Sequence, residues 1–111
     1  MSIIDEIAAE RRRQVEEEGW SLEHDDEHDR GELAVAAACY AKHAADFRDA
    51  LENGVTYRTK ATPPDWPWDR HWWKPENARR DLIRAGALIV AEIERLDRLA
   101  EWERLQGKDQ P

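Results

Sequence analysis

The sequence predicts an all-α fold, a small three-helix bundle with a long C-terminal helix. Apolar residues recur at helical spacing in three separate runs, and helix start and stop signals flank those runs. The one long interruption, a Pro- and Trp-rich loop, lies between the second run and the third. Because 111 residues are the length of one domain, we expect a single helical domain over residues 1–106 and a disordered tail over 107–111.

The first helix is expected over residues 3–18. Ser2 and Asp5, three positions apart, match a capping box, and Gly19 ends the segment. The apolar residues between them follow helical spacing: Ile3, Ile4, Ile7, Ala8 and Val15.

The second helix is expected to begin near Asp29 and to end at the helix-stop dipeptide Asn53–Gly54. Its many alanines indicate close helix packing. The lone Cys39 cannot form an internal disulfide and is expected to be a small buried thiol. The stripe that defines this helix is Leu33, Ala36, Ala37, Tyr40, Ala44, Phe47 and Leu51.

Residues 55–77 break all helical periodicity, because four prolines alternate with four tryptophans there. The third helix then starts at the N-cap Asn77 and runs toward Leu105, a length of roughly 40 Å. Its expected apolar stripe is Leu82, Ala85, Ile89, Ile93, Leu96 and Leu99.

The third helix is longer than the two shorter helices can cover. Its end, which carries Leu96, Leu99 and Trp102, would therefore expose an apolar strip to water. We expect a second subunit to cover this strip, and so predict a homodimer.

Charge and hydropathy exclude several classes of function. The formal charge of -8 and the pI near 5 argue against duplex nucleic acid as a partner, because phosphate backbones require a basic surface. There is no signal-peptide pattern and no apolar run that would span a bilayer. A cytoplasmic protein without membrane contact is expected.

The densest ionisable cluster runs from His24 through Asp25 and Asp26 to Asp29, and Glu32 follows it. If a helix already covers these positions, carboxylates at this spacing share a face and are suited to Mg²⁺. Acidic residues at a helix N-terminus are also stabilised by the helix dipole without any metal. Both interpretations stay open.

The Trp-rich loop also has two interpretations. Four tryptophans within eight positions would either plug the open end of the helical core or form a stacking wall for a nucleobase. In the second case basic residues around the loop would neutralise phosphates. The residues concerned are Trp66, Trp68, Trp72 and Trp73 for the wall, and Arg70, Lys74, Arg79, Arg80 and Arg84 for the charge.

Residues 5–98 resemble a family of small phage and prophage proteins. The matching motifs are Glu18-Gly19-Trp20, His24-Asp25-Asp26, Gly31-Glu32-Leu33, Cys39-Tyr40-Ala41, Trp66-Pro67-Trp68, Trp72-Trp73-Lys74-Pro75 and Ala91-Glu92-Ile93-Glu94-Arg95-Leu96. The resemblance implies a phage or prophage setting and the cytoplasm of a bacterial host, and it names no ligand.

Two shorter stretches resemble other families. Gly19-Trp20 followed by His24-Asp25-Asp26 resembles the ryanodine-receptor repeat domain. The run from His28 to Leu33 resembles the first metal-binding helix of MazG-type nucleoside triphosphate pyrophosphohydrolases, which implies Asp29 and Glu32 as Mg²⁺ ligands. That family has a second acidic pair, whereas here Ala78 stands three positions before Asp81.

Our first functional hypothesis is a module without a cofactor that binds a nucleotide or a nucleotide-derived signal. In a phage it would sequester a host immune messenger. The expected ligand-binding residues are Trp20, His24, Asp25, Asp26, Trp66, Trp68, Trp72, Trp73, Lys74, Arg79 and Arg80.

Two other functions remain open. The alternative from a different class is a Mg²⁺-dependent pyrophosphohydrolase, with Asp29, Glu32, Asp81 and Glu92 at the metal. A protein-interaction module that docks through the Trp-rich loop is the third hypothesis.

Overall fold

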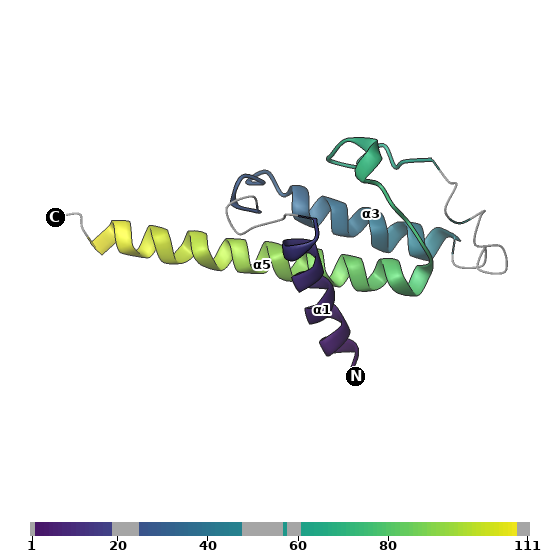
Figure 1. The fold of residues 1–111 in the computed structure, drawn as a ribbon. Helices are drawn as coiled ribbons and strands as arrows, with labels where there is room; N and C mark the ends of the chain where they lie inside the picture. The colour runs from purple at the N-terminus through teal and green to yellow at the C-terminus, as the bar shows by residue number, and fades with distance from the viewer. Residues whose placement is uncertain (1, 19–24, 48–56, 58–60, 109–111) are drawn as a thin grey trace.

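The computed structural model describes residues 2–18, 25–47, 57 and 61–108. Helices and loops make up this part of the chain, and it contains no strand. Figure 1 shows α3 lying along the first half of α5 and α1 crossing the same helix. The all-α three-helix fold with a long C-terminal helix is confirmed. The elements are α1 (Ile3–Glu16), α3 (Glu32–Phe47), the short 3-10 helix η2 (Arg70–Trp72) and α5 (Ala78–Lys108).

Helix α1 begins as predicted but buries a different face. The Ser2 hydroxyl accepts from the Asp5 amide at 3.0 Å, and the Asp5 carboxylate accepts from the Ser2 amide at 3.2 Å, so the capping box is confirmed. The expected apolar face is wrong, because Ile3 and Ile4 are exposed. Ile7 reaches the backbone of Gly86 on α5. The buried residues are instead polar: Glu10, Arg11 and Gln14.

Helix α3 starts at Glu32, three residues later than expected. Gly31 has a φ of 82°, a left-handed conformation that glycine adopts without strain and that separates the helix from the preceding turn. The Asn53–Gly54 stop lies outside the described residues. The predicted stripe is buried where it is described, with Phe47 at its edge, and its small alanines pack against α5.

Helix α5 begins at the predicted cap, since the Asn77 side chain accepts from the Arg80 amide at 2.8 Å. Its 31 residues span about 46 Å. The helix includes Gly107 and ends at Lys108, so it extends two residues into the segment expected to be a tail. The remainder of that tail lies outside the described residues.

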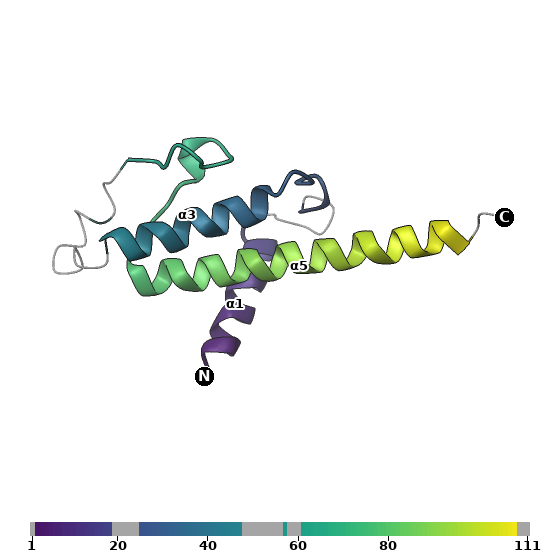
Figure 2. The same cartoon turned by 180° about the vertical axis from the view of Figure 1, so that it is seen from behind.

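The predicted apolar stripe of α5 is wrong, because most of its members face solvent. Figures 1 and 2 show α3 along one side of α5 and α1 across it. Helices α1 and α3 pack against different sides of α5, and close helix packing requires small residues at both contacts. The alanines are therefore buried, while Leu82 and Ile89 are about half exposed. The buried apolar residues are Ile83, Ala85, Ala87, Leu88 and Ala91.

The Trp-rich loop folds over α3 and completes the core. Tyr40 stacks on Trp73, with ring centroids 4.7 Å apart, and meets the edge of Trp66 at 5.5 Å. Trp66 and Trp73 are each 8% exposed, and Trp68 packs against them from a half-buried position. The core interpretation of the loop therefore holds for these three residues, whereas Trp72 is 36% exposed.

Among the described helices, none combines the length and the apolar character needed to cross a membrane.

Candidate functional site

The acidic segment expected to bind ligand makes ion pairs that tie the chain together. Asp25 is buried, and its carboxylate accepts from Arg11 of α1 at 2.7 Å. Asp26 accepts from Arg98 of α5 at 2.7 Å. These two aspartates therefore connect the turn before α3 to the other two helices. Trp20 and His24 lie outside the described residues.

The residues expected to bind Mg²⁺ are not brought together. Asp29 and Glu32 lie at the start of α3, whereas Asp81 lies in the first turn of α5. Figure 1 shows that this turn lies beside the other end of α3. Residues 2–18, 25–47, 57 and 61–108 contain no group of three His, Cys, Asp or Glu side chains suited to a metal ion.

The Asp81 carboxylate already has several donors. It is buried and accepts from the Tyr57 hydroxyl at 2.5 Å, from Arg84 at 3.0 Å and from the Glu76 amide at 3.2 Å. Burial raises the pKa of Asp81, and these donors offset only part of that effect. Glu92, the further residue of the metal hypothesis, accepts from Arg95 at 2.5 Å. Asp81 thus connects α5 to Tyr57, whereas Glu92 pairs within α5 itself.

The basic residues gather where α1 crosses the start of α5. Two adjoining recesses lie there, and Glu10 and Arg13 line both of them. The first is an open hollow of about 260 Å³, and the second is a more enclosed one of about 20 Å³. We call the pair the cationic groove. Its basic residues are Arg13, Lys74, Arg79, Arg80 and Arg84.

Glu10 orients two of the basic side chains of this groove. Its carboxylate accepts two hydrogen bonds from Arg13, at 2.7 and 2.8 Å, and one from Gln14 at 3.1 Å. Arg80 of α5 donates a further bond to it. Burial alone would raise the pKa of Glu10, but the two guanidinium groups outweigh burial and lower it. Glu10 is therefore an ionised anchor that fixes two of the five basic side chains.

The remaining basic side chains are also oriented by defined partners. Arg79 pairs with Glu6, with its two nitrogens 3.1 and 2.6 Å from the carboxylate oxygens. Arg84 donates to the Lys74 carbonyl oxygen at 2.9 Å and to Glu76 at 2.6 Å. Five basic and three acidic side chains line the groove, and Arg84 also pairs with Glu76 and Asp81 at its edge.

Aromatic residues form one wall of the enclosed recess. The Lys74 ammonium lies 5.4 Å from the centre of the Trp72 ring, and the Arg84 guanidinium lies 5.9 Å from that of Tyr40. Burial raises the pKa of Tyr40 to about 12, so its hydroxyl stays protonated. Trp72 contributes the exposed indole of this wall.

Gln14 gives the enclosed recess an unsatisfied acceptor. This residue is 2% exposed, and its amide nitrogen is committed to the Glu10 carboxylate. That bond fixes the orientation of the amide. The carbonyl oxygen of Gln14 then has no hydrogen-bond partner in the described part of the chain. It can accept from a water molecule or from an N–H or O–H group of a ligand.

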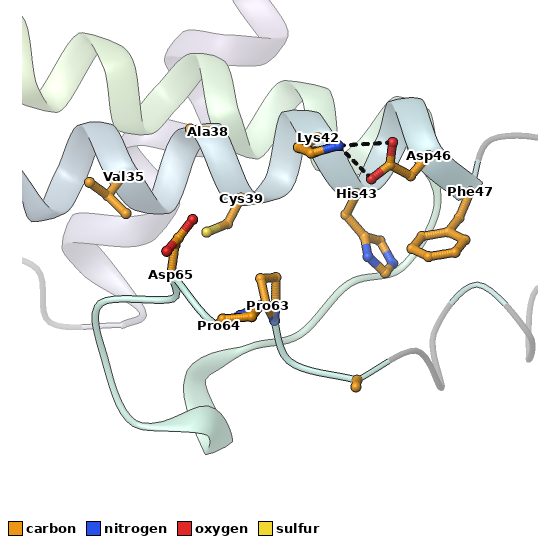
Figure 3. A pocket seen from close by; sticks show the side chains of 11 residues that line it. Val35, Ala38, Cys39, Lys42, His43, Asp46, Phe47, Pro63, Pro64 and Asp65 are labelled. Carbon is orange, nitrogen blue, oxygen red and sulfur yellow. Dashed lines mark hydrogen bonds and ion pairs between the residues drawn. The ribbon is translucent and has the colours of Figure 1, made fainter.

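A larger and mainly apolar pocket lies beside the Trp-rich loop. Figure 3 shows it between the outer face of α3 and the turn at Pro63 and Pro64. Its volume is about 710 Å³. Lys42 at its rim pairs with Asp46, and the acidic Asp65 stands across from α3. This pocket therefore has no excess of positive charge with which to attract phosphate.

The pocket also offers no activated nucleophile. Cys39 is buried, and burial raises the pKa of its thiol, with the negative charge of Asp65 adding to this effect. His43, one turn further along α3, is buried and makes a 3.0 Å hydrogen bond between its Nε2 and the Tyr57 carbonyl oxygen. Neither residue is set up for covalent chemistry.

Sequence reasoning identified part of the groove. Lys74, Arg79, Arg80 and Trp72 were predicted, and they line the two adjoining recesses. Glu10, Arg13, Gln14 and Tyr40 were missed as site residues. A polar patch within α1, Glu10-Arg11-Arg12-Arg13-Gln14, was the available signal.

The chain was compared with protein-family models, with curated proteins and with solved structures, and no match was found in any of the three.

Proposed function

We propose that this chain is a binding module for a small nucleotide-type ligand and that the cationic groove is its site. The observation that supports this most is the concentration of five basic side chains from three segments in an acidic chain. Guanidinium and ammonium groups at such a density favour phosphate. The neighbouring carboxylates orient the guanidinium groups.

The aromatic wall supports a ligand that carries a base. An exposed indole beside a cation is a surface on which a nucleobase stacks. Trp72 is the loop tryptophan that offers this, because Trp66 and Trp73 belong to the core. A ligand with phosphate over Arg79 and Arg80 and its base near Trp72 would occupy the open hollow and lie over the mouth of the enclosed recess, which has room for about one water molecule.

The positions of the described carboxylates favour binding without a metal ion. Asp29, Glu32 and Asp81 lie in two separate regions, and Asp81 is engaged with Tyr57 and Arg84. We further propose the setting implied by the family resemblance. The module would act in the cytoplasm of a bacterial host and sequester a signal there.

The homodimer expected from the sequence belongs to this proposal as well. It is supported by the large apolar side chains of α5 that are about half exposed, among them Ile93 and Leu96.

The test is calorimetric titration of the purified chain with nucleoside mono-, di- and triphosphates and with cyclic and linear dinucleotides, with and without Mg²⁺. Trp72→Ala and Lys74→Ala should each weaken the binding of a hit by about tenfold or more, which is the loss expected for one stacking or charge contact. Trp102→Ala and Arg104→Ala are matched controls, since both residues are exposed near the far end of α5. They should leave affinity unchanged.

Chromatography of the recovered hit separates binding from hydrolysis. A ligand that returns intact supports the binding module. Recovery as monophosphate and pyrophosphate only in the presence of Mg²⁺ would establish the pyrophosphohydrolase instead. If no member of the panel binds, the proposal fails.

A further inference from the structure

One face of α5, which borders α1 at Gly86, carries a regular apolar pattern. Its residues are spaced alternately by four and three positions, which is the 3.5-residue repeat of a coiled-coil seam. The large members are exposed by 51%, 49%, 52% and 48%, respectively, for Leu82, Ile89, Ile93 and Leu96. We call this set the α5 seam: Leu82, Gly86, Ile89, Ile93, Leu96 and Ala100.

A second helix with the same 3.5-residue repeat can pack along this seam. From Leu82 to Ala100 the seam is about 27 Å long, which is ample for a helix pair. Val90 and Leu99, both exposed, extend the apolar surface at its margins. Trp102 is nine residues from Ile93 and therefore lies on the opposite side of α5. The tryptophan that was expected to share the dimer strip thus does not belong to the seam.

The order of large and small residues along the seam allows two antiparallel copies to place a large residue opposite a small one. If a second α5 lies antiparallel with the two-fold axis level with Ala91, Ile89 faces Ile93. At the outer positions, Leu82 faces the small Ala100, and Leu96 faces Gly86, which has Ile7 of α1 beside it. In a parallel pair, Leu82 would face Leu82 and Ala100 would face Ala100, and the two alanines would leave a void.

Gly86 has a further role in this arrangement. Ile7 of α1 lies 3.0 Å from the position that a side-chain Cβ would occupy there, so a larger residue would collide with α1. Leu96 of a second copy would therefore contact the Ile7 side chain, which fills the space beside Gly86.

We propose that the occupant of the α5 seam is a second copy of this chain, paired antiparallel through α5. This pairing goes beyond the ligand proposal and does not depend on it. Because Arg79 and Arg80 lie in the first turn of α5, the dimer carries its two cationic grooves at opposite ends of the helix pair.

Sedimentation equilibrium of the full chain over a range of concentrations tests the pairing. The wild type should dimerise reversibly, and Ile93→Asp should raise the dissociation constant by about 100-fold or more, because two charges would face the apolar seam. Ile4→Asp is the matched control, since Ile4 is a 74% exposed isoleucine of α1 and not a seam residue, and this variant should dimerise like the wild type. Circular dichroism of both variants verifies that the helices are intact.

Two results would overturn the pairing. One is a wild type that stays monomeric up to about 1 mM, the weak end of specific association. The other is an Ile93→Asp variant that dimerises as tightly as Ile4→Asp. In the first case another macromolecule, and not a second copy, would be the partner of the seam.

Cysteine cross-linking in a Cys39→Ser background tests the orientation. A mixture of Leu82→Cys and Ala100→Cys chains should form disulfides between the two kinds of chain under mild oxidation, and neither chain should cross-link with itself. Cross-links between two Leu82→Cys chains would mean parallel pairing and contradict the proposed antiparallel arrangement. Ligand titration of Ile93→Asp should give wild-type affinity per chain, so a failure of the dimer is distinguishable from a failure of the site.

Discussion

Replacing Glu10 by Gln removes the charge at the centre of the cationic groove while preserving side-chain shape. Each carboxylate oxygen of Glu10 accepts two hydrogen bonds: one oxygen from Arg13 and Arg80, the other from Arg13 and Gln14. A Gln side chain keeps one oxygen and places an NH₂ group against donors at the other. Two charge-assisted bonds are therefore lost.

The magnitude follows from the burial of the partners. Hydrogen bonds to charged groups each contribute about 1.5–3 kcal/mol, so two of them contribute up to about 6 kcal/mol. Arg13 and Arg80 have side chains that are 27% and 32% exposed, so water recovers part of this loss. We expect Glu10→Gln to lower the free energy of unfolding by about 3 kcal/mol, and the Tm by about 10 °C.

Urea unfolding followed by far-ultraviolet circular dichroism measures this loss. Because the pKa of Glu10 is lowered in the folded state, its stabilisation is present above the ordinary value of 4.5 and is lost as the pH falls through the folded pKa. The difference between wild type and variant should therefore shrink on acidification below 4.5. Glu101→Gln makes the same change in the exposed Glu101–Arg104 pair and should leave the unfolding midpoint unchanged. Equal stability of wild type and Glu10→Gln near neutral pH would refute the anchor role.

Three further changes test other parts of the structure. Tyr57→Phe removes a donor from the buried Asp81 carboxylate and should cost about 2 kcal/mol in urea unfolding; the cost should vanish in an Asp81→Ala background, which has no side-chain acceptor, and its persistence there would show that the hydroxyl acts elsewhere. Asp25→Ala strands the Arg11 guanidinium without its buried partner and should cost about 3 kcal/mol by the same assay, whereas a cost no larger than that of a surface change would mean the pair is solvated. Cys39 should react with a thiol reagent far more slowly in the native protein than in urea, because burial both covers it and raises its pKa; equal rates would show an open, accessible thiol.

Local signals allowed most helix starts to be predicted. The Ser2 cap, the Asn77 cap and the apolar stripe of α3 all depend on residues within a few positions of each other. Such patterns are visible in a sequence because the interactions themselves are local.

The buried face of α1 could not be predicted in this way. Glu10 and Arg11 are buried because partners far along the chain neutralise them: Arg80 bonds to Glu10 across 70 positions, and Arg11 bonds to Glu94 across 83. Hydropathy ranks such residues as exposed. Burial of a charged group is decided by whether a partner reaches it, and that depends on the tertiary fold.

The faces of α5 were misassigned for a related reason. Hydropathy placed the large aliphatic residues in the core, but two helices contact α5, and its alanines allow them to approach closely. Ile93 and Leu96 were left on the third face. The same uncertainty affected the loop tryptophans, because composition alone cannot separate the buried Trp73 from the exposed Trp72.

The most direct test of the central claim, that the cationic groove binds a nucleotide-type ligand, is an NMR titration of the tryptophan indole N–H signals. The Trp72 signal is assigned by its loss in Trp72→Phe, and that of Trp102 by its loss in Trp102→Phe. A nucleotide that binds as proposed should shift the Trp72 signal in a saturable way and leave the Trp102 signal unmoved. No saturable shift at Trp72 with any nucleotide of the panel, or a shift confined to Trp102, would contradict the site.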